Sequence, residues 1–261
     1  MIDRAVAHVI TTKPPLSDPS HGALLGLCAL TCQFTGYVIS LLSNLEISAR
    51  VALEYSTKLE SPTVHHVAWV IWVIYLRQVR SPHATWLASC TLMHMVGTVS
   101  LHVEPSSQAR FPACDAHYGP EQRRRIYAVA QQLHMWIAYE YGHPRVELHG
   151  ATCTLPKDFW SAEQLAIWQI SDALDPKNHL DATALERLLL QTVGLSLEST
   201  VLQLMRCNIG LSIYRRLHAI GRIVSHSVFD KVLRLIDESF DLATTLVDER
   251  TPWWHVMTVP F

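Results

Sequence analysis

Residues 121–144 read EQRRRIYAVAQQLHMWIAYEYGHP, and this stretch decides the fold class. Its patterning is helical through Tyr141, and Gly142 followed by Pro144 is a typical signal for the end of a helix. We therefore predict a helix over 120–141. Similar patterning lies on both sides, so the chain is expected to be all-α. The predicted helices cover 22–43, 46–58, 63–79, 83–101, 120–141, 161–174, 181–192, 197–220 and 225–248.

The remaining segments are short and predict a single multi-helix domain. Residues 1–20 hold three prolines and are expected to form an irregular lead-in. Two polar connections, 102–119 and 142–160, interrupt the helices, and the second has an extended character. Neither is long enough for a flexible domain linker, and no internal repeat is present. One helical domain over 21–261 is therefore predicted.

Composition excludes several classes of protein. The chain has 261 residues, of which 49% are hydrophobic and 17% are charged. A chain of this length and composition can bury a large core and is unlike a disordered protein. Its formal net charge of -2 gives no basic excess to hold a polyphosphate backbone, so direct nucleic-acid binding is not expected.

The apolar stretch 22–42 is long enough to be considered as a membrane span. It contains Gln33, several hydroxyl side chains and two cysteines, and no basic cluster flanks it, so a buried helix is favoured over a span. The N-terminus lacks the pattern of a signal peptide, and the scattered cysteines include no Cys-x-x-Cys pair. We predict a nuclear or cytoplasmic protein with no membrane segment and no metal site.

Two stretches of sequence and the C-terminus carry a family resemblance. In the stretch TWLASCTLMHMVGTVSLHVEP, Trp86, Leu101 and His102 match a helix that begins with tryptophan and ends in a Gly-Leu-His-Arg-Asp type motif. Ser100 stands at the position of the motif's glycine. In 121–144, the arginines at the start and the Gly-x-Pro at the end match a second motif helix. The end of the chain, TPWWHVMTVPF, is similar to a Pro-Trp segment that follows later.

In this order, the three motifs resemble the regulatory (middle homology) domain of fungal zinc-cluster transcription factors. The resemblance implies an α-helical fold and a nuclear regulator that controls transcription or senses a metabolite. The chain departs from the family in lacking the zinc cluster that reads DNA. It also ends at Phe261, where the family's domain usually continues, so we expect either a truncated fragment or a separate gene product.

Histidines occupy three positions where the resemblance implies fixed charges. His94 and His143 stand where the family has arginine, and His134 stands where it has aspartate. One hypothesis is a pocket in which His94, His102 and His134 act as acid–base catalysts. The alternative is that these histidines are buried and make structural hydrogen bonds. The expected ligand-binding residues of the pocket are Gln131, Trp136, Tyr139, Glu104 and His143.

Three functions remain open on the sequence. The leading one is a regulatory or ligand-binding module that lacks its own DNA-binding domain and binds an apolar small molecule or a protein. The alternative is an enzyme of secondary metabolism, a cyclase or isomerase that needs no cofactor and uses the histidine pocket. The third is a decoy that pairs with an intact homologue or with itself, with residues 251–261 as the contact.

Overall fold

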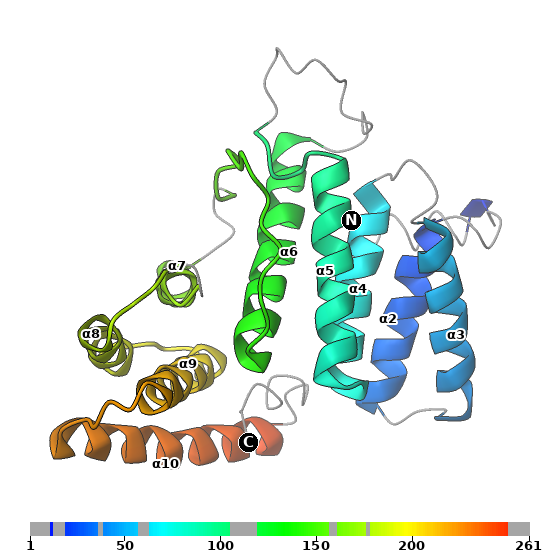
Figure 1. Ribbon diagram of the computed structural model, residues 1–261. Coiled ribbons are helices and arrows are strands. Elements are labelled where there is room, and N and C mark those ends of the chain that lie inside the picture. The colour runs from blue at the N-terminus through cyan, green and yellow to red at the C-terminus, as the bar shows by residue number, and fades with distance from the viewer. Residues whose placement is uncertain are drawn as a thin grey trace. The chain divides into compact units, whose positions relative to one another are not determined.

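The computed structural model describes residues 11–12, 19–35, 39–56, 63–104, 119–156, 161–175 and 178–249. All regular secondary structure in these residues is helical, which confirms the all-α prediction (Figure 1). The helices fall into two compact units, residues 1–159 and 160–261. The single domain over 21–261 and the irregular lead-in stay predictions, and the C-terminal segment 251–261 lies outside the described residues.

Unit 1 contains five long helices. They are α2 (Pro19–Thr35), α3 (Ile39–Ser56), α4 (Thr63–Val79), α5 (Pro82–Thr98) and α6 (Pro120–Tyr141). Helix α2 packs against α3 and α4, and α4, α5 and α6 pack against one another. Helices α4 and α6 have the predicted bounds. Gly142 ends α6 with a φ of 67°, the left-handed conformation expected of a glycine at this position.

The predicted helix over 22–43 is wrong in its extent. The apolar stretch is divided between α2, which ends at Thr35, and α3, which begins at Ile39. None of the helices in the described residues has the length and apolar character needed to cross a membrane. Within unit 1, a Cβ atom on Gly26 would lie 3.0 Å from Cγ2 of Ile71, so the glycine allows α2 and α4 to approach closely.

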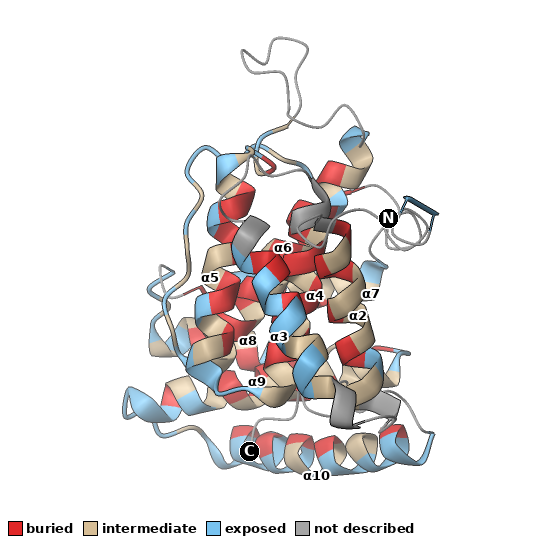
Figure 2. Cartoon of the chain, turned by 90° about the vertical axis from the view of Figure 1, so that its right-hand side faces the viewer, coloured by how far each residue is buried: buried red, intermediate tan, exposed pale blue. Residues whose placement is uncertain are grey.

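The core of unit 1 lies between α4 and its neighbours, where Figure 2 shows buried residues of α4 and α5. Trp72 and Tyr75 stack with their ring centroids 5.3 Å apart. The Tyr75 hydroxyl donates to Glu46 at 3.2 Å, and burial together with this carboxylate raises the pKa of Tyr75 to about 12. Arg77 of α4 pairs with Glu140 of α6 at 2.8 Å, which ties the two helices together beside the apolar core.

Unit 2 contains α7 (Ala162–Ala173), α8 (Ala182–Val193), α9 (Thr200–Ala219) and α10 (His226–Asp248). Helix α9 packs against the other three and is buried on several sides. Ser161 and Asp181 cap the starts of α7 and α8, as their positions in the sequence predict. A Cβ atom on Gly210 would lie 2.7 Å from Cδ1 of Leu235, so the glycine permits the close packing of α9 and α10.

Candidate functional site

Residues 143–156, here called the strap, follow α6 and run without helical structure beside it (Figure 1). Side chains and backbone groups of α5, α6 and the turn after α5 hold the strap in place. The indole Nε1–H of Trp86 donates to the carbonyl of Pro144 at 2.9 Å. The backbone N–H groups of Thr152 and Cys153 both donate to the carbonyl of His102 at 3.0 Å. The strap is therefore an ordered part of unit 1, held by these hydrogen bonds.

His134 is the most constrained of the predicted site residues. Its side chain is buried, with 1% of the residue exposed. The backbone N–H of Val146 in the strap donates to Nε2 at 2.8 Å, and Nδ1 lies 2.9 Å from the hydroxyl of Ser89. Because Nε2 accepts a hydrogen bond, the ring proton is on Nδ1 and is donated to Ser89. The Ser89 hydroxyl in turn donates to the carbonyl of Trp86 at 2.7 Å.

This environment keeps the His134 imidazole neutral. Burial is the main cause that lowers its pKa from 6.5 to about 4, and electrostatic repulsion from Arg145 and His94 contributes to this shift. Both ring nitrogens already have protein partners at normal hydrogen-bond distances. To act as a general base at neutral pH, His134 would have to break its contact with Val146. The geometry therefore favours a structural hydrogen-bonding role for this residue.

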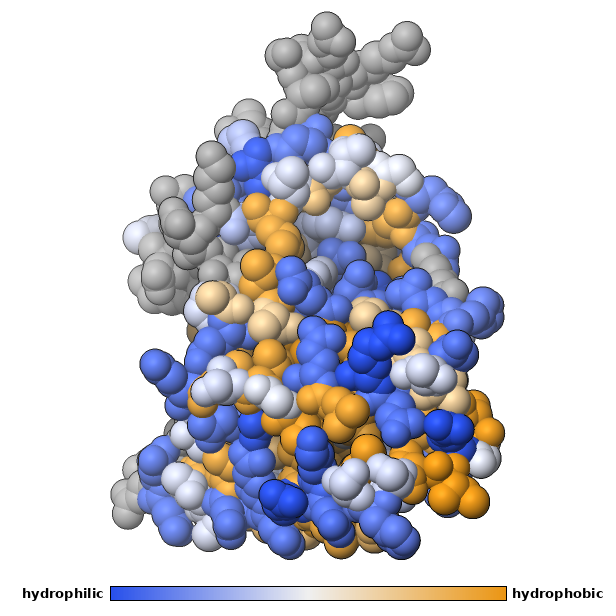
Figure 3. All heavy atoms as spheres, turned by 90° about the vertical axis from the view of Figure 1, so that its left-hand side faces the viewer, coloured by the Kyte–Doolittle hydropathy of each residue, from blue (hydrophilic) through white to orange (hydrophobic). Residues whose placement is uncertain are grey.

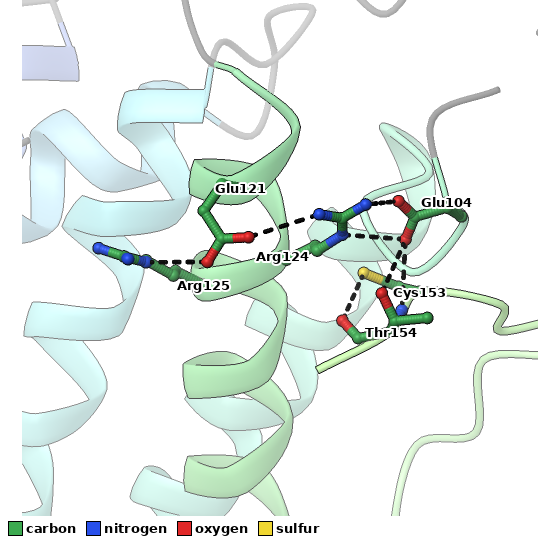
Figure 4. A network of polar contacts seen from close by, with 6 residues as sticks. All are labelled: Glu104, Glu121, Arg124, Arg125, Cys153 and Thr154. Carbon is green, nitrogen blue, oxygen red and sulfur yellow. Dashed lines mark hydrogen bonds and ion pairs between the residues drawn. The ribbon is translucent and has the colours of Figure 1, made fainter. Parts of the chain in front are cut away.

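Glu104 anchors the far part of the strap through the network drawn in Figure 4. Its carboxylate forms an ion pair with Arg124 of α6 and accepts from the backbone N–H of Thr154 at 3.3 Å. The Thr154 hydroxyl donates to the same oxygen at 3.4 Å. The hydrogen bond from Arg124 is the largest of the effects that lower the pKa of Glu104. Arg124 also reaches Glu121 at 3.4 Å, and Arg125 reaches the same carboxylate at 3.3 Å, so both of these arginines are held by carboxylates.

An aromatic cluster marks the other end of the strap. The rings of His143 and Trp86 stack with centroids 4.5 Å apart, and His83 lies 5.8 Å from Trp86. His83 is exposed, whereas Trp86 and His143 are half-buried. His143 thus contacts an aromatic side chain of α5 at the surface of unit 1, close to the hydrogen bond between Trp86 and Pro144.

The remaining predicted residues lie in different environments. His94 is exposed on α5, while His102 is half-buried at the turn after α5. Gln131, Trp136 and Tyr139 are half-buried on α6. A buried atom without a hydrogen-bond partner occurs at Nδ1 of His102 and at Nε1 of Trp136. A pocket that joins His94, His102 and His134 stays a prediction, as do the ligand-binding roles.

The turn after α5 contains a residue with an unusual backbone conformation, Ser100. Ser100 has a φ of 53°, in the left-handed region that glycine adopts most readily. This conformation agrees with the resemblance, which places a glycine at this position. Arg123 of α6 lies 3.5 Å from the carbonyls of Val99 and Ser100, which fixes the turn against α6.

Sequence reasoning missed several residues that hold the site together. Ser89 orients His134, Arg77 pairs with Glu140, and Arg124 binds Glu104. The position of Arg124 in the motif could have indicated a structural role, but its partner Glu104 lies in a separate segment of the chain. In the described part of the chain, no group of three or more His, Cys, Asp or Glu side chains is arranged to hold a metal ion.

Comparison with known proteins finds relatives of similar sequence in fungi. The chain is 36% identical over 221 residues to Transcription factor kojR of Aspergillus flavus, and equally to that of Aspergillus oryzae, covering 82% of this chain and 40% of each relative. It is 32% identical over 253 residues to Protein RDR1 of Gibberella zeae, covering 94% of this chain and 46% of that protein. The homologues of this chain therefore include fungal transcription factors.

The matched region is only part of these relatives, since the chain spans about 40% to 46% of their length. No protein-family model and no solved structure matches the chain.

Proposed function

We propose that this chain is the helical regulatory region of a fungal transcription factor of the zinc-cluster type, which acts in the nucleus through a bound protein or small molecule. The observation that carries the proposal is the 36% identity to Transcription factor kojR over 82% of the chain. The net charge of -2 agrees with a region that does not itself contact DNA.

The geometry of unit 1 supports this proposal over the enzymatic alternative. A cyclase or isomerase would need acid–base groups that can exchange protons with a substrate. His134 is buried and neutral and has both ring nitrogens occupied, and Glu104 is held by Arg124 and Thr154. These side chains stabilise the strap, as expected for a module whose role is to hold a defined surface.

A reporter assay in a fungal host tests the proposal. The chain is inserted between a heterologous DNA-binding domain and a strong activation domain, and transcription is compared with that of a fusion carrying an inert helical protein of similar size. Coupling free energies between regulatory sites typically correspond to about fivefold or larger effects, so we expect a change of at least about fivefold.

Equal output from the two fusions, at equal protein levels, would reject the regulatory role. Incubation of the purified chain with fungal extracts is the complementary assay. Formation of a product that is absent when His134 is replaced by alanine, in a variant that is still folded, would establish the enzymatic alternative instead.

A further inference from the structure

Helix α10 carries two apolar stripes, and the packing of unit 2 uses only one of them. The first stripe is buried and includes Val228, Val232, Leu235 and Leu246 (Figure 2). The second stripe is exposed or half-buried. It contains Phe229, Leu233, Ile236, Phe240, Ala243 and Val247. On the face drawn in Figure 3, hydrophobic residues reach the surface among hydrophilic ones in the lower half.

The spacing of the second stripe alternates between four and three residues along its whole length. At 3.6 residues per turn, this spacing puts all six side chains on one face of α10, beside the buried stripe. Phe240 is 60% exposed and Val247 is 57% exposed. Large apolar side chains at this spacing are typical of a seam between two helices.

An acidic rim follows the free edge of this stripe. Asp230, Asp237, Asp241 and Asp248 are all exposed. Their positions on a helical wheel fall within a narrow sector next to the second apolar stripe, on the side away from the buried one. Arg234 and Lys231 are exposed basic residues of α10 beyond this rim. The surface therefore combines an apolar seam with a negative border.

We infer that this face of α10 is the docking site for an amphipathic helix of a partner protein, one whose apolar seam is bordered by lysine or arginine. Opposite charges along the seam would select this partner and set its orientation. The stripe is about 27 Å long at 1.5 Å per residue, which is shorter than an independent coiled coil requires. A short helix that lies on a folded surface fits it better.

A second copy of this chain is a poorer occupant. It would present the same acidic side chains, so two identical faces would have no opposite charges to pair along the seam. The inference names the partner of the proposed regulatory region and depends on the proposed function only for its role in transcription. Binding itself is measured on the purified full chain.

Two fluorescent helical peptides test the inference directly. They share one apolar seam and differ only in the rim, which is lysine in one peptide and glutamate in the other. Fluorescence anisotropy with the full chain at low ionic strength should show at least about tenfold tighter binding of the lysine peptide, because like charges along an interface are strongly disfavoured. Salt should narrow the difference, since the rim is exposed to solvent.

Matched variants locate the binding on α10. Phe240→Ala should lower the affinity for the lysine peptide by about tenfold, since large central aromatic side chains dominate helix-in-groove binding. Asp237→Lys should weaken the binding of the lysine peptide and strengthen the binding of the glutamate peptide. The controls are Ile223→Ala and Glu198→Lys, at exposed positions of unit 2 outside α10, and both should leave binding unchanged.

Three results of the peptide experiments would overturn the inference. They are equal binding of the two peptides, binding of neither, and an effect of the control variants as large as that of the α10 variants. Sedimentation showing a dimer that Phe240→Ala dissociates would identify a second copy as the occupant and would also overturn it. If the peptides bind as expected while the reporter fusion is inactive, the docking site stands and the proposed function fails.

Discussion

The surroundings of the strap in unit 1 and the face of α10 that carries the second stripe and the acidic rim, here called the outer face, differ in how their side chains are engaged. Along the strap, polar side chains are paired with one another or with the backbone, as in the contacts of His134 with Ser89 and Val146. On α10, large apolar side chains such as Phe240 remain exposed beside an acidic rim. In the first region the polar side chains stabilise the structure, whereas in the second the apolar side chains remain accessible to a partner.

This difference changes where recognition is to be sought. A polar residue at an unexpected motif position suggests a functional site in a sequence, but its hydrogen bonds in the structure decide whether it is available to a ligand. An exposed apolar stripe attracts less attention, although folded proteins rarely expose contiguous apolar surface without a use. On this comparison, substitutions along the strap should act on stability, and substitutions on the outer face of α10 should act on binding.

The largest expected effect is that of His134→Ala. The change leaves the Ser89 hydroxyl and the Val146 N–H without their partner and opens a cavity, so the free energy of unfolding should fall by about 3 to 4 kcal/mol. Urea unfolding followed by circular dichroism at pH 7.5 measures it. The matched control is His94→Ala, at an exposed position of α5, which should cost less than about 0.5 kcal/mol. Similar losses for both variants would contradict the structural role of His134.

The pH dependence of stability gives a second, related effect. The unfolded chain binds a proton at His134 near its ordinary pKa of 6.5, whereas the folded chain does so only near pH 4. The contribution of His134 is therefore fully present above pH 6.5 and is lost as the pH falls from 6.5 to about 4, by up to ~3 kcal/mol. The stability difference between the wild-type chain and His134→Gln should shrink over this range, and a constant difference would refute the assignment.

The ion pair between Arg77 and Glu140 should contribute a smaller amount. Only 15% and 18% of the two side chains are exposed, so Arg77→Met, which leaves Glu140 without this partner, should cost about 1 to 2 kcal/mol. The exposed pair of Arg50 and Glu54 is the control, and Arg50→Met should cost less than about 0.5 kcal/mol. Equal urea midpoints for the two variants would show that the pair on α4 and α6 is not structural.

Ser100→Gly should make the chain more stable. Because Ser100 has a φ of 53°, glycine removes the steric strain of its side chain, and we expect a gain of about 0.5 to 1 kcal/mol. Thr98→Gly, in the last turn of α5, is the control and should lower stability by about 1 kcal/mol, because glycine is a poorer helix former and the hydrogen bond from the Thr98 hydroxyl to the carbonyl of Met95 is lost. Thermal unfolding of the two variants should therefore shift in opposite directions, and a loss in Ser100→Gly would disprove the strain.

The smallest expected effect on stability is that of Phe240→Ala. Its side chain is 60% exposed, so the free energy of unfolding should change by less than about 0.5 kcal/mol. Leu235→Ala on the buried stripe of the same helix is the control and should cost about 2 to 4 kcal/mol. A loss as large for Phe240 as for Leu235 would mean that the exposed stripe is part of the core.

The fold was predictable where its determinants are local. Gly142 ends α6 and Asp181 begins α8, because turn and capping signals act within a few residues. The division between α2 and α3 was missed because a continuous apolar stretch has no periodicity that marks a boundary. The available signal was Gly36, which directly follows the last residue of α2 in the sequence.

The candidate site was harder to predict because its contacts join distant residues. His134 was identified as unusual, but Ser89 lies 45 positions away in the sequence and the Val146 N–H belongs to the strap. The same spacing rule that identifies the buried stripe of α10 also fits the exposed one. Which of the two faces the core depends on the packing of α9 and α10, which sequence periodicity alone does not contain.

The most direct test of this account is the reporter fusion carrying Phe240→Ala, compared with the wild-type fusion at matched protein level. If recognition lies on α10, the variant keeps its urea midpoint but loses most of the effect of the chain on transcription, and Ile223→Ala behaves like wild type. An unchanged reporter response in Phe240→Ala, with its stability also unchanged, would contradict the claim that recognition lies on α10.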